Sequence, residues 1–205
     1  ESLSNLTHEL KGTKHILIVA CGTSYHAGLI AQSLIEDMAR IPTQTEIASE
    51  LRYKDPIISQ NTLVLAISQS GETADTIAAV KEAKAKGAKI IGFCNVENST
   101  LTREADAVIF LNAGIEKSVC STKAFTSQIT VLSLFALKMG RLRHLTKKEG
   151  KKFLNEFLQI PKKIQTILDK EKEIIELAKK YSRFNNFFFI GRRYMYPTSL
   201  EAALK

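Results

Sequence analysis

The sequence predicts an α/β protein built on a doubly wound, five-stranded parallel sheet flanked by helices. Short, nearly continuous apolar runs such as 15–20 and 62–67 alternate with longer segments of helical periodicity such as 74–86. Runs of this kind are typical of strands buried on both faces of a parallel sheet. Parallel neighbours need a crossover connection, which is usually a helix, so the alternation itself favours this class.

The individual elements follow from local patterns, taken in chain order. Leu29, Ile30 and Leu34 have helical spacing, and the next helical segment ends at Gly87, a residue that commonly terminates helices. The expected strands are 15–20, 43–48, 62–67, 89–94 and 107–111, and the expected helical segments are 25–38, 74–86 and a short turn at 101–104.

Further helices are expected after the fifth strand. Residues 122–141 are apolar around most of the helical circumference, which predicts a helix packed deep against the sheet or against a partner. Two more helical patterns follow at 147–168 and 170–181.

The end of the chain repeats its beginning in outline. An apolar run at 186–190, then Gly191 and a helix opening near Pro197, has the order of strand, glycine turn and helix seen at 15–38. We therefore expect a first domain, a helical connector, and the first strand and helix of a truncated second domain, over 1–145, 146–182 and 183–205 respectively.

The composition is that of a globular chain. Of 205 residues, 44% are hydrophobic and 24% charged, which suits one domain with a real core and leaves no room for a long disordered tract. The apolar runs fall short of the roughly 18 to 20 residues that cross a bilayer, and the start lacks a secretion signal, so we expect a cytoplasmic protein. Opening on Glu1 indicates a processed chain or an excised fragment.

Cysteine usage and charge exclude other classes. Cys21, Cys94 and Cys120 are widely spaced, without a CxxC motif, so neither a disulfide framework nor a zinc site is expected, and Cys94 reads as a small core residue. The net charge of +8 comes from residues 138–205, which hold 17 basic and 7 acidic side chains. Scattered lysine pairs with few aromatics favour a solvated helix face over a nucleic-acid site.

Three hydroxyl-rich loops carry the candidate chemistry. They follow the first strand (Cys21, Gly22, Thr23, Ser24), follow the third strand (Ser68, Gln69, Ser70, Gly71, Glu72, Thr73), and precede the long apolar helix (118–123). Ligands of doubly wound sheets bind beyond the carboxyl ends of the strands, where helix N-termini and hydroxyl groups suit an anion. Because the glycine-rich nucleotide signatures are missing, the loops favour a small phosphorylated metabolite over a nucleotide. The alternative is that these Ser and Thr residues only cap helices.

Three further side chains near these loops have open roles. Glu72 would repel an anion, so we expect it to face outward and complement the N-terminus of its own helix. Lys123 either binds the anion or merely occupies the first helical turn. Cys21 as a nucleophile activated by His26 is the less favoured reading, because no pairing geometry is evident.

Five segments together resemble a known family. They are Ala-Cys-Gly-Thr-Ser-Tyr (20–25), Glu-Ile-Ala-Ser-Glu-Leu-Arg-Tyr (46–53), Ser-Gln-Ser-Gly-Glu-Thr-Ala-Asp-Thr (68–76), Cys-Asn-Val (94–96) with Arg-Glu-Ala-Asp (103–106), and Ser-Thr-Lys-Ala-Phe-Thr (121–126). In this order and spacing they resemble the first sugar-isomerase (SIS) domain of the glutamine:fructose-6-phosphate aminotransferases, or glucosamine-6-phosphate synthases. The resemblance runs from about residue 15 to the end and implies a flavodoxin-like SIS fold.

The resemblance also implies an activity and a site. The family makes glucosamine 6-phosphate and glutamate from fructose 6-phosphate and glutamine, in a cytoplasmic homodimer, without metal or organic cofactor. It joins a glutaminase domain to two SIS domains. The residues it assigns to the sugar phosphate are Cys21, Gly22, Thr23, Ser24, Ser68, Gln69, Ser70, Thr73, Val119 and Ser121.

Lys205 matches a lysine that the family places in its active site. The family's acid/base carboxylate lies beyond this position, and moving a proton between adjacent carbons needs such a group, so the fragment is expected to bind without turnover. Glu201, at i,i+4 from Lys205, is read as a structural partner on the same helix.

Two alternatives remain to the synthase reading. One is a regulatory SIS module that senses a sugar phosphate and is joined to a DNA-binding domain, and the other is a single-domain sugar-phosphate isomerase. No helix-turn-helix pattern precedes residue 15, and 187–205 begins a structure that a single-domain isomerase lacks. Both observations favour the synthase.

Overall fold

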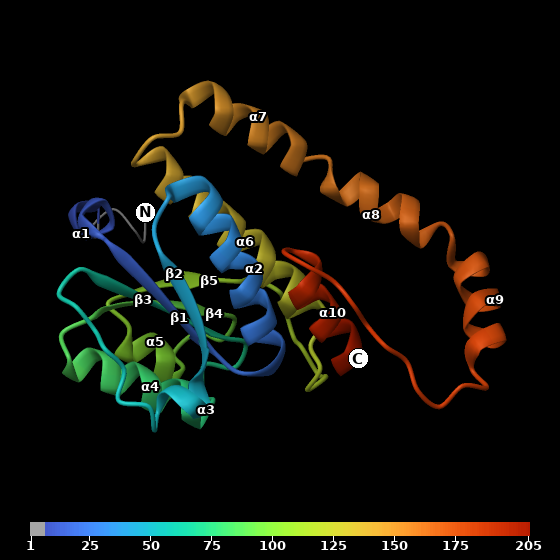
Figure 1. Ribbon diagram of the computed structural model, residues 1–205, viewed down its shortest axis with the longest axis horizontal. Helices are drawn as coiled ribbons and strands as arrows, with labels where there is room; N and C mark the ends of the chain where they lie inside the picture. Colours follow the sequence, from blue (N-terminus) through green and yellow to red (C-terminus); the bar gives the residue numbers. More distant parts are fainter. Residues whose placement is uncertain (1–6) are drawn as a thin grey trace.

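A parallel five-stranded sheet forms the centre of the molecule (Figure 1). The computed structural model describes residues 7–205. The strand order is β2-β1-β3-β4-β5, and every neighbouring pair is parallel. The strands are β1 (His15–Ala20), β2 (Thr43–Ile47), β3 (Thr62–Ser68), β4 (Lys89–Cys94) and β5 (Ala107–Phe110). The predicted fold class is therefore confirmed, and each of these strands coincides with a predicted one to within a residue.

Helices cover both faces of the sheet. One face carries α2 (Gly22–Ala39) and α6 (Lys123–Arg141), while the other carries α3 (Ala48–Leu51), α4 (Ala74–Ala85) and α5 (Thr100–Glu104). The alternation of side chains along β1 divides the core accordingly: Ile16 and Ile18 pack with α2 and α6, whereas Leu17 and Val19 pack with α3 and α4. A short helix, α1 (Thr7–Gly12), precedes β1.

Helix α2 approaches the sheet closely because of Gly28. A Cβ at this position would lie 3.0 Å from the side-chain methyl carbons of Ile18 and of Thr45. The absence of a side chain at Gly28 therefore lets the first half of α2 lie directly on β1 and β2, next to the loop that follows β1.

Helix α6 packs deep against the sheet, which is one of the two placements predicted for it. Leu132, Phe135 and Met139 are buried against α2 and the sheet. Phe135 also meets Phe93 of β4 edge to face, with ring centroids 5.5 Å apart. Only Leu134 among its large apolar side chains is exposed, so α6 itself leaves no broad apolar face uncovered.

Three helices extend away from the sheet in Figure 1 as an arm, which we define as residues 146–193. They are α7 (Lys147–Phe157), α8 (Ile160–Leu168) and α9 (Glu171–Tyr181). The predicted single helix over 147–168 is wrong, because Pro161, in the first turn of α8, lacks an N–H and clashes with a continuing preceding turn. The lysine pairs of the arm are exposed, as expected of a solvated face.

The predicted strand at 186–190 does not form a strand within the described chain. These residues have no neighbouring strand and are exposed, with Phe188 at 96% and Ile190 at 90%. A β-type sequence cannot form a ladder without a partner. The proposed division into a first domain, a connector and the start of a second domain stays a prediction.

The chain returns to the body through α10 (Met195–Leu204), which packs beside α2. Arg193 and Tyr194 both bind the carboxylate of Asp37, the tyrosine hydroxyl at 2.7 Å from Oδ2. Burial, followed by this hydrogen bond, raises the pKa of Tyr194 to about 12. These contacts join the N-terminal end of α10 to the C-terminal end of α2. The two helices therefore run antiparallel, and Glu201 of α10 lies beside Thr23 in the first turn of α2. No helix within residues 7–205 has both the length and the apolar character of a membrane span.

Candidate functional site

The loops after β1 and β3 flank the point where the strand order reverses. Since β2 lies on one side of β1 and β3 on the other, the crossovers leave β1 and β3 in opposite directions. A crevice between such strands, at their carboxyl ends, is the usual ligand site of a doubly wound sheet. We call this side of the sheet the carboxyl edge. Thr76 in the first turn of α4 reaches across it, with Oγ1 3.9 Å from Cys21 Sγ.

The loop after β3, residues 68–73, is a compact turn held by its own hydroxyl groups. Ser68 is buried at the end of β3, and its Oγ accepts a hydrogen bond from Gly71 N at 2.9 Å and lies 3.3 Å from Thr73 Oγ1. Ser70 Oγ accepts from Glu72 N at 3.2 Å. The hydroxyl groups of Ser68, Ser70 and Thr73 are thus brought to one turn, beside the half-buried Gln69.

Gly71 allows this turn to close. Its φ is +69°, a left-handed conformation that favours glycine. A Cβ there would also lie 2.6 Å from Ser99 Cβ and 2.7 Å from Cys94 Sγ, which are both buried. Cys94 is the small core residue that was predicted. A glycine is therefore required at this position for both conformation and space.

The N-terminus of α4 is open toward this turn. Thr73 occupies the N-cap position with extended backbone angles, but its side chain makes no capping hydrogen bond. The first N–H groups of a helix point outward and carry partial positive charge, so an uncapped start is suited to an anion. Hydroxyl donors and open backbone donors therefore converge in one place.

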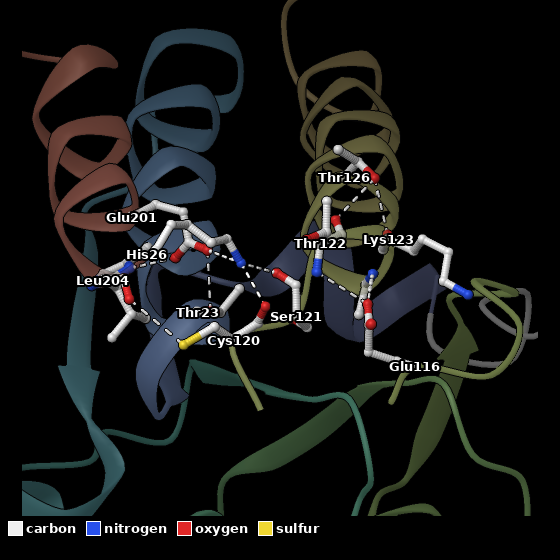
Figure 2. Close-up of polar contacts among 12 residues, drawn as sticks. Thr23, His26, Glu116, Cys120, Ser121, Thr122, Lys123, Thr126, Glu201 and Leu204 are labelled. Carbon is white, nitrogen blue, oxygen red and sulfur yellow. Dashed lines mark hydrogen bonds and ion pairs between the residues drawn. The ribbon is translucent and has the colours of Figure 1, made fainter. Parts of the chain in front are cut away.

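The N-terminus of α6 is closed by the chain's own carboxylate. Glu116 Oε2 accepts hydrogen bonds from the backbone N–H groups of Thr122, at 3.0 Å, and Ala124, at 3.2 Å (Figure 2). These bonds, the one from Ala124 first, lower the pKa of Glu116. An external anion at this helix start would have to displace a carboxylate that is already bound.

The loop after β1 presents a second set of groups at the carboxyl edge. Cys21 is the N-cap residue of α2 and Gly22, at φ +54°, is its first helical residue. Thr23 and Ser24 are buried, and Ser24 Oγ accepts a 2.8 Å hydrogen bond from Gln128 Nε2 of α6. Gln128 is fully buried, so this bond fixes the start of α2 against α6.

A buried carboxylate joins α2 to α10. Glu201 Oε1 accepts from Thr23 Oγ1 at 3.2 Å and from Lys205 Nζ at 3.0 Å, and Glu201 Oε2 lies 2.7 Å from His26 Nδ1 (Figure 2). The predicted pairing of Glu201 with Lys205 is confirmed. His26 pairs with Glu201, so the less favoured reading, in which His26 activates Cys21, gains no support.

The loop before α6 meets the end of α10. Lys205 Nζ donates to the backbone carbonyl of Cys120 at 2.8 Å and also to that of Ser121, and Cys120 Sγ lies 3.6 Å from the carbonyl oxygen of Leu204. Ser121 is buried, whereas Val119 is fully exposed. Lys205 therefore lies at the carboxyl edge, whereas the side chain of Val119 faces solvent.

Glu72 and Lys123, whose roles the sequence left open, both make hydrogen bonds within the chain. Glu72 faces outward as expected, but it binds the N–H and hydroxyl groups of Thr100, at 2.7 and 2.8 Å, and so complements α5 rather than its own helix. Those two bonds lower the pKa of Glu72. Lys123 sits on the first turn of α6, where its ammonium binds the carbonyl of Ile115.

One other pocket of the described chain fits a phosphate less well. A pocket of about 650 Å³ lies near the amino ends of β1 and β2, but its lining includes Glu36, Glu46 and Asp55 against Lys54, a balance unfavourable to a dianion. Within residues 7–205, no three His, Cys, Asp or Glu side chains are grouped as a metal site requires.

Sequence reasoning missed three of the groups that build this site: Glu116 at the start of α6, Gln128 beneath Ser24, and the pairing of His26 with Glu201. Gln128 and Ser24 are 104 positions apart, and His26 and Glu201 are 175 apart. No local spacing connects such residues. The polar Gln128 within an otherwise apolar helix face was the one available signal.

Comparison with known proteins agrees with this architecture. Residues 9–138 match the SIS domain family. A glutamine–fructose-6-phosphate aminotransferase (isomerizing) from Chlorobaculum tepidum is 47% identical over 196 residues, covering 96% of this chain and 32% of that protein. The same-named protein from Thermotoga maritima is 42% identical over 205 residues, covering 100% of this chain and 34% of that protein.

A solved structure is similar over nearly the whole chain. The C-terminal domain of glucosamine-fructose-6-phosphate aminotransferase from Francisella tularensis superimposes with a TM-score of 0.94 at 40% identity, covering 98% of this chain and 58% of that one. The chain spans about a third of the length of the curated relatives that it matches.

Proposed function

The chain belongs to the SIS domain family, and from that premise we propose that it is the sugar-phosphate-binding part of a glutamine–fructose-6-phosphate aminotransferase. In this proposal the turn at 68–73 holds the 6-phosphate of fructose 6-phosphate. The observation that carries the proposal is the open N-terminus of α4 beside the hydroxyl groups of Ser68, Ser70 and Thr73.

The hydrogen-bond chemistry of the turn supports a phosphate monoester. A dianion accepts several charge-assisted hydrogen bonds at once, and these are roughly twice as strong as neutral ones. The turn offers hydroxyl and backbone N–H donors, while its one carboxylate, Glu72, is directed away toward Thr100. The other nearby carboxylate, Asp75 in the first turn of α4, is paired with Arg52 at 3.5 Å, which offsets its charge.

The sugar would lie between the turn and the start of α2. Cys21, Gly22, Thr23 and Ser24 line the neighbouring strand end, and Ser121 and Lys205 approach from the other side through the loop before α6. We assign Lys205 to the sugar end of the site, since its ammonium is held at this edge. In this proposal the side chain of Val119, which is fully exposed, would be covered by the ligand or by another part of a longer protein.

The proposed activity belongs to a longer protein. That protein would form glucosamine 6-phosphate and glutamate from fructose 6-phosphate and glutamine, without metal or organic cofactor. We propose that the present chain binds without turnover, because proton transfer between adjacent carbons needs a free carboxylate. Glu201, the carboxylate nearest Lys205, already uses both oxygens for Thr23, Lys205 and His26.

We also propose a cytoplasmic homodimer as the working form. The arm exposes many large apolar side chains, and broad exposed apolar surface commonly marks an interface. These residues include Leu158, Ile167, Leu168, Phe187, Phe188 and Ile190. Sedimentation over a range of concentrations tests this proposal: self-association is expected, and a strictly monomeric profile at high concentration would argue against it.

Calorimetric titration with fructose 6-phosphate tests the binding proposal. Ser70→Ala is expected to weaken binding by about 1 to 2 kcal/mol, the scale of a lost hydrogen bond to a charged group. Ser182→Ala on the arm, which removes a hydroxyl that donates to the local carbonyl of Lys179, is the matched control and should bind like the unsubstituted chain. Unchanged affinity in Ser70→Ala would count against the proposed phosphate position.

A further inference from the structure

We propose that His26 is a positioning residue that, through Glu201, fixes the ammonium group of Lys205 at the carboxyl edge. The contacts of the Thr23–His26–Glu201–Lys205 cluster carry the inference. The inference rests on the proposed function only for the identity of the ligand near Lys205. The arrangement of the four side chains does not depend on a bound sugar.

The protonation of the cluster follows from its contacts. A carboxylate accepts hydrogen bonds and cannot donate them, so the 2.7 Å contact requires a proton on Nδ1 of His26. His26 and Glu201 have side chains that are 13% and 6% exposed. A carboxylate oxygen buried to this degree needs a partner, and within the described chain Oε2 has only the histidine.

Because Glu201 contacts both His26 and Lys205, the orientation that His26 gives the carboxylate also determines where Lys205 binds. Its other oxygen, Oε1, accepts from Thr23 and Lys205, so the orientation of the carboxylate plane is set by His26 on one side and Thr23 on the other. If the δ N–H of His26 were removed, the carboxylate could rotate or draw in water to satisfy Oε2. The oxygen that faces Lys205 would then no longer be fixed.

The ammonium of Lys205 has a complete set of acceptors. Its three N–H donors match Glu201 Oε1, the carbonyl of Cys120 and the carbonyl of Ser121. An ammonium held by three acceptors is fixed in place and orientation, whereas most lysine side chains remain mobile. The cluster therefore presents Lys205 as a fixed positive charge between the loop before α6 and the start of α2.

The test replaces the δ N–H while keeping other features. His26→Asn retains an N–H donor at the δ position, His26→Phe retains a ring without a donor, and His8→Phe makes the same change at an exposed histidine of α1. Circular dichroism and backbone amide spectra verify that each chain is folded and that α10 remains docked.

The first readout is the ammonium signal of Lys205 in a chain labelled with ¹⁵N-lysine, measured without ligand. A fixed ammonium exchanges its protons slowly and gives a separate ¹H–¹⁵N signal, which Lys205→Arg identifies by removing it. We expect this signal in the unsubstituted chain, in His8→Phe and in His26→Asn, and its loss in His26→Phe. Its absence from the unsubstituted chain, its survival in His26→Phe, or its loss in both His26 variants would each overturn the proposal.

The second readout is calorimetric affinity for fructose 6-phosphate. His26→Phe is expected to weaken binding about five-fold, the scale of one partly exposed charge interaction, and His26→Asn to restore it. Equal affinity in all three chains would overturn the assignment of Lys205 to the ligand through His26. Failure of the proposed function would instead appear as no binding by the unsubstituted chain, with the ammonium signal and its dependence on His26 intact.

Discussion

The N-termini of α4 and α6 differ in what occupies them, although both follow hydroxyl-rich loops at the carboxyl edge. At α6, Glu116 binds the N–H groups of Thr122 and Ala124. At α4, the side chain of the N-cap residue Thr73 makes no capping hydrogen bond within residues 7–205. The comparison teaches that a hydroxyl-rich loop does not by itself leave a helix N-terminus free for an external anion, because at α6 the chain's own carboxylate is already bound there.

The two positions also differ in the glutamate nearest to them. Glu116 turns toward the helix that follows it, whereas Glu72, inside the turn at 68–73, turns away to Thr100. The pKa values of both carboxyl groups are lowered by backbone hydrogen bonds, so both are ionised at neutral pH. The carboxylate of Glu116 therefore occupies the N-terminus of α6, whereas the carboxylate of Glu72 binds Thr100 and not the N-terminus of α4.

The largest expected effect comes from a substitution that prevents the turn before α4 from closing. Gly71→Ala would place a Cβ 2.7 Å from Cys94 Sγ in a residue with φ of +69°. Strain and overpacking together should lower the free energy of unfolding by about 2 to 4 kcal/mol and abolish measurable fructose 6-phosphate binding. Denaturant unfolding and calorimetry measure the two effects.

Gly87→Ala is the matched control for that substitution. Gly87 also has a positive φ, +86°, but a Cβ there would meet nothing within 4 Å. The cost should be about 1 kcal/mol, with affinity unchanged. If both glycine variants lost the same stability and neither lost binding, the turn at 68–73 would not need the tight closure described here.

A smaller effect is expected from removing a hydroxyl of the open site. Thr73→Val keeps the shape of the side chain but removes the oxygen that lies 3.3 Å from Ser68 Oγ. Affinity for fructose 6-phosphate should fall by about 1 kcal/mol, one net hydrogen bond. The equivalent change at the closed site, Thr122→Val, should leave the affinity unaltered, and a loss of affinity there would contradict the distinction between the two helix starts.

A substitution at the N-terminus of α6 tests the same comparison at the helix start that is already occupied. Glu116→Gln removes the charge that complements α6, so the melting temperature should fall slightly, while fructose 6-phosphate affinity should not change. Thermal melts and calorimetry check both statements. Glu97→Gln, a change to an exposed glutamate elsewhere, is the control for general charge effects. Weakened ligand binding in Glu116→Gln would mean that the two sites are coupled.

The smallest effect is the pH dependence of the Glu116 contribution. Its folded pKa lies below the unfolded value, so the stabilisation is complete above the unfolded pKa and is lost as the pH falls through the folded pKa. The melting-temperature difference between the unsubstituted chain and Glu116→Gln should therefore shrink from pH 7 toward about pH 3. A difference that stayed constant or grew on acidification would contradict the role assigned to Glu116.

Much of the fold could be predicted from the sequence because the buried strands of a parallel sheet are recognisable as short apolar runs. The five strands were located to within a residue, but α1 and α3 were missed, because helices of 6 and 4 residues carry too little periodicity. The strand expected at 186–190 failed for another reason. Its local pattern suits a strand, but a strand forms only beside another one.

Only the part of the candidate site that the order of the strands determines could be predicted from the sequence. Strand ends place the loops at 21–24 and 68–73 at one edge of any doubly wound sheet, so topology predicts where these residues lie, and their role in binding stays a prediction. The closing of α6 by Glu116 and the pairing of His26 with Glu201 depend on side-chain packing between segments that are remote or irregular in sequence. No periodicity records such contacts.

The most direct test of the central claim is a crystal structure of this chain soaked in fructose 6-phosphate. The account predicts phosphate density within hydrogen-bond distance of Ser68, Ser70 and Thr73 at the N-terminus of α4, with Glu116 still bound at α6. Density for the phosphate at the start of α6 or elsewhere, with the turn at 68–73 empty, would contradict it.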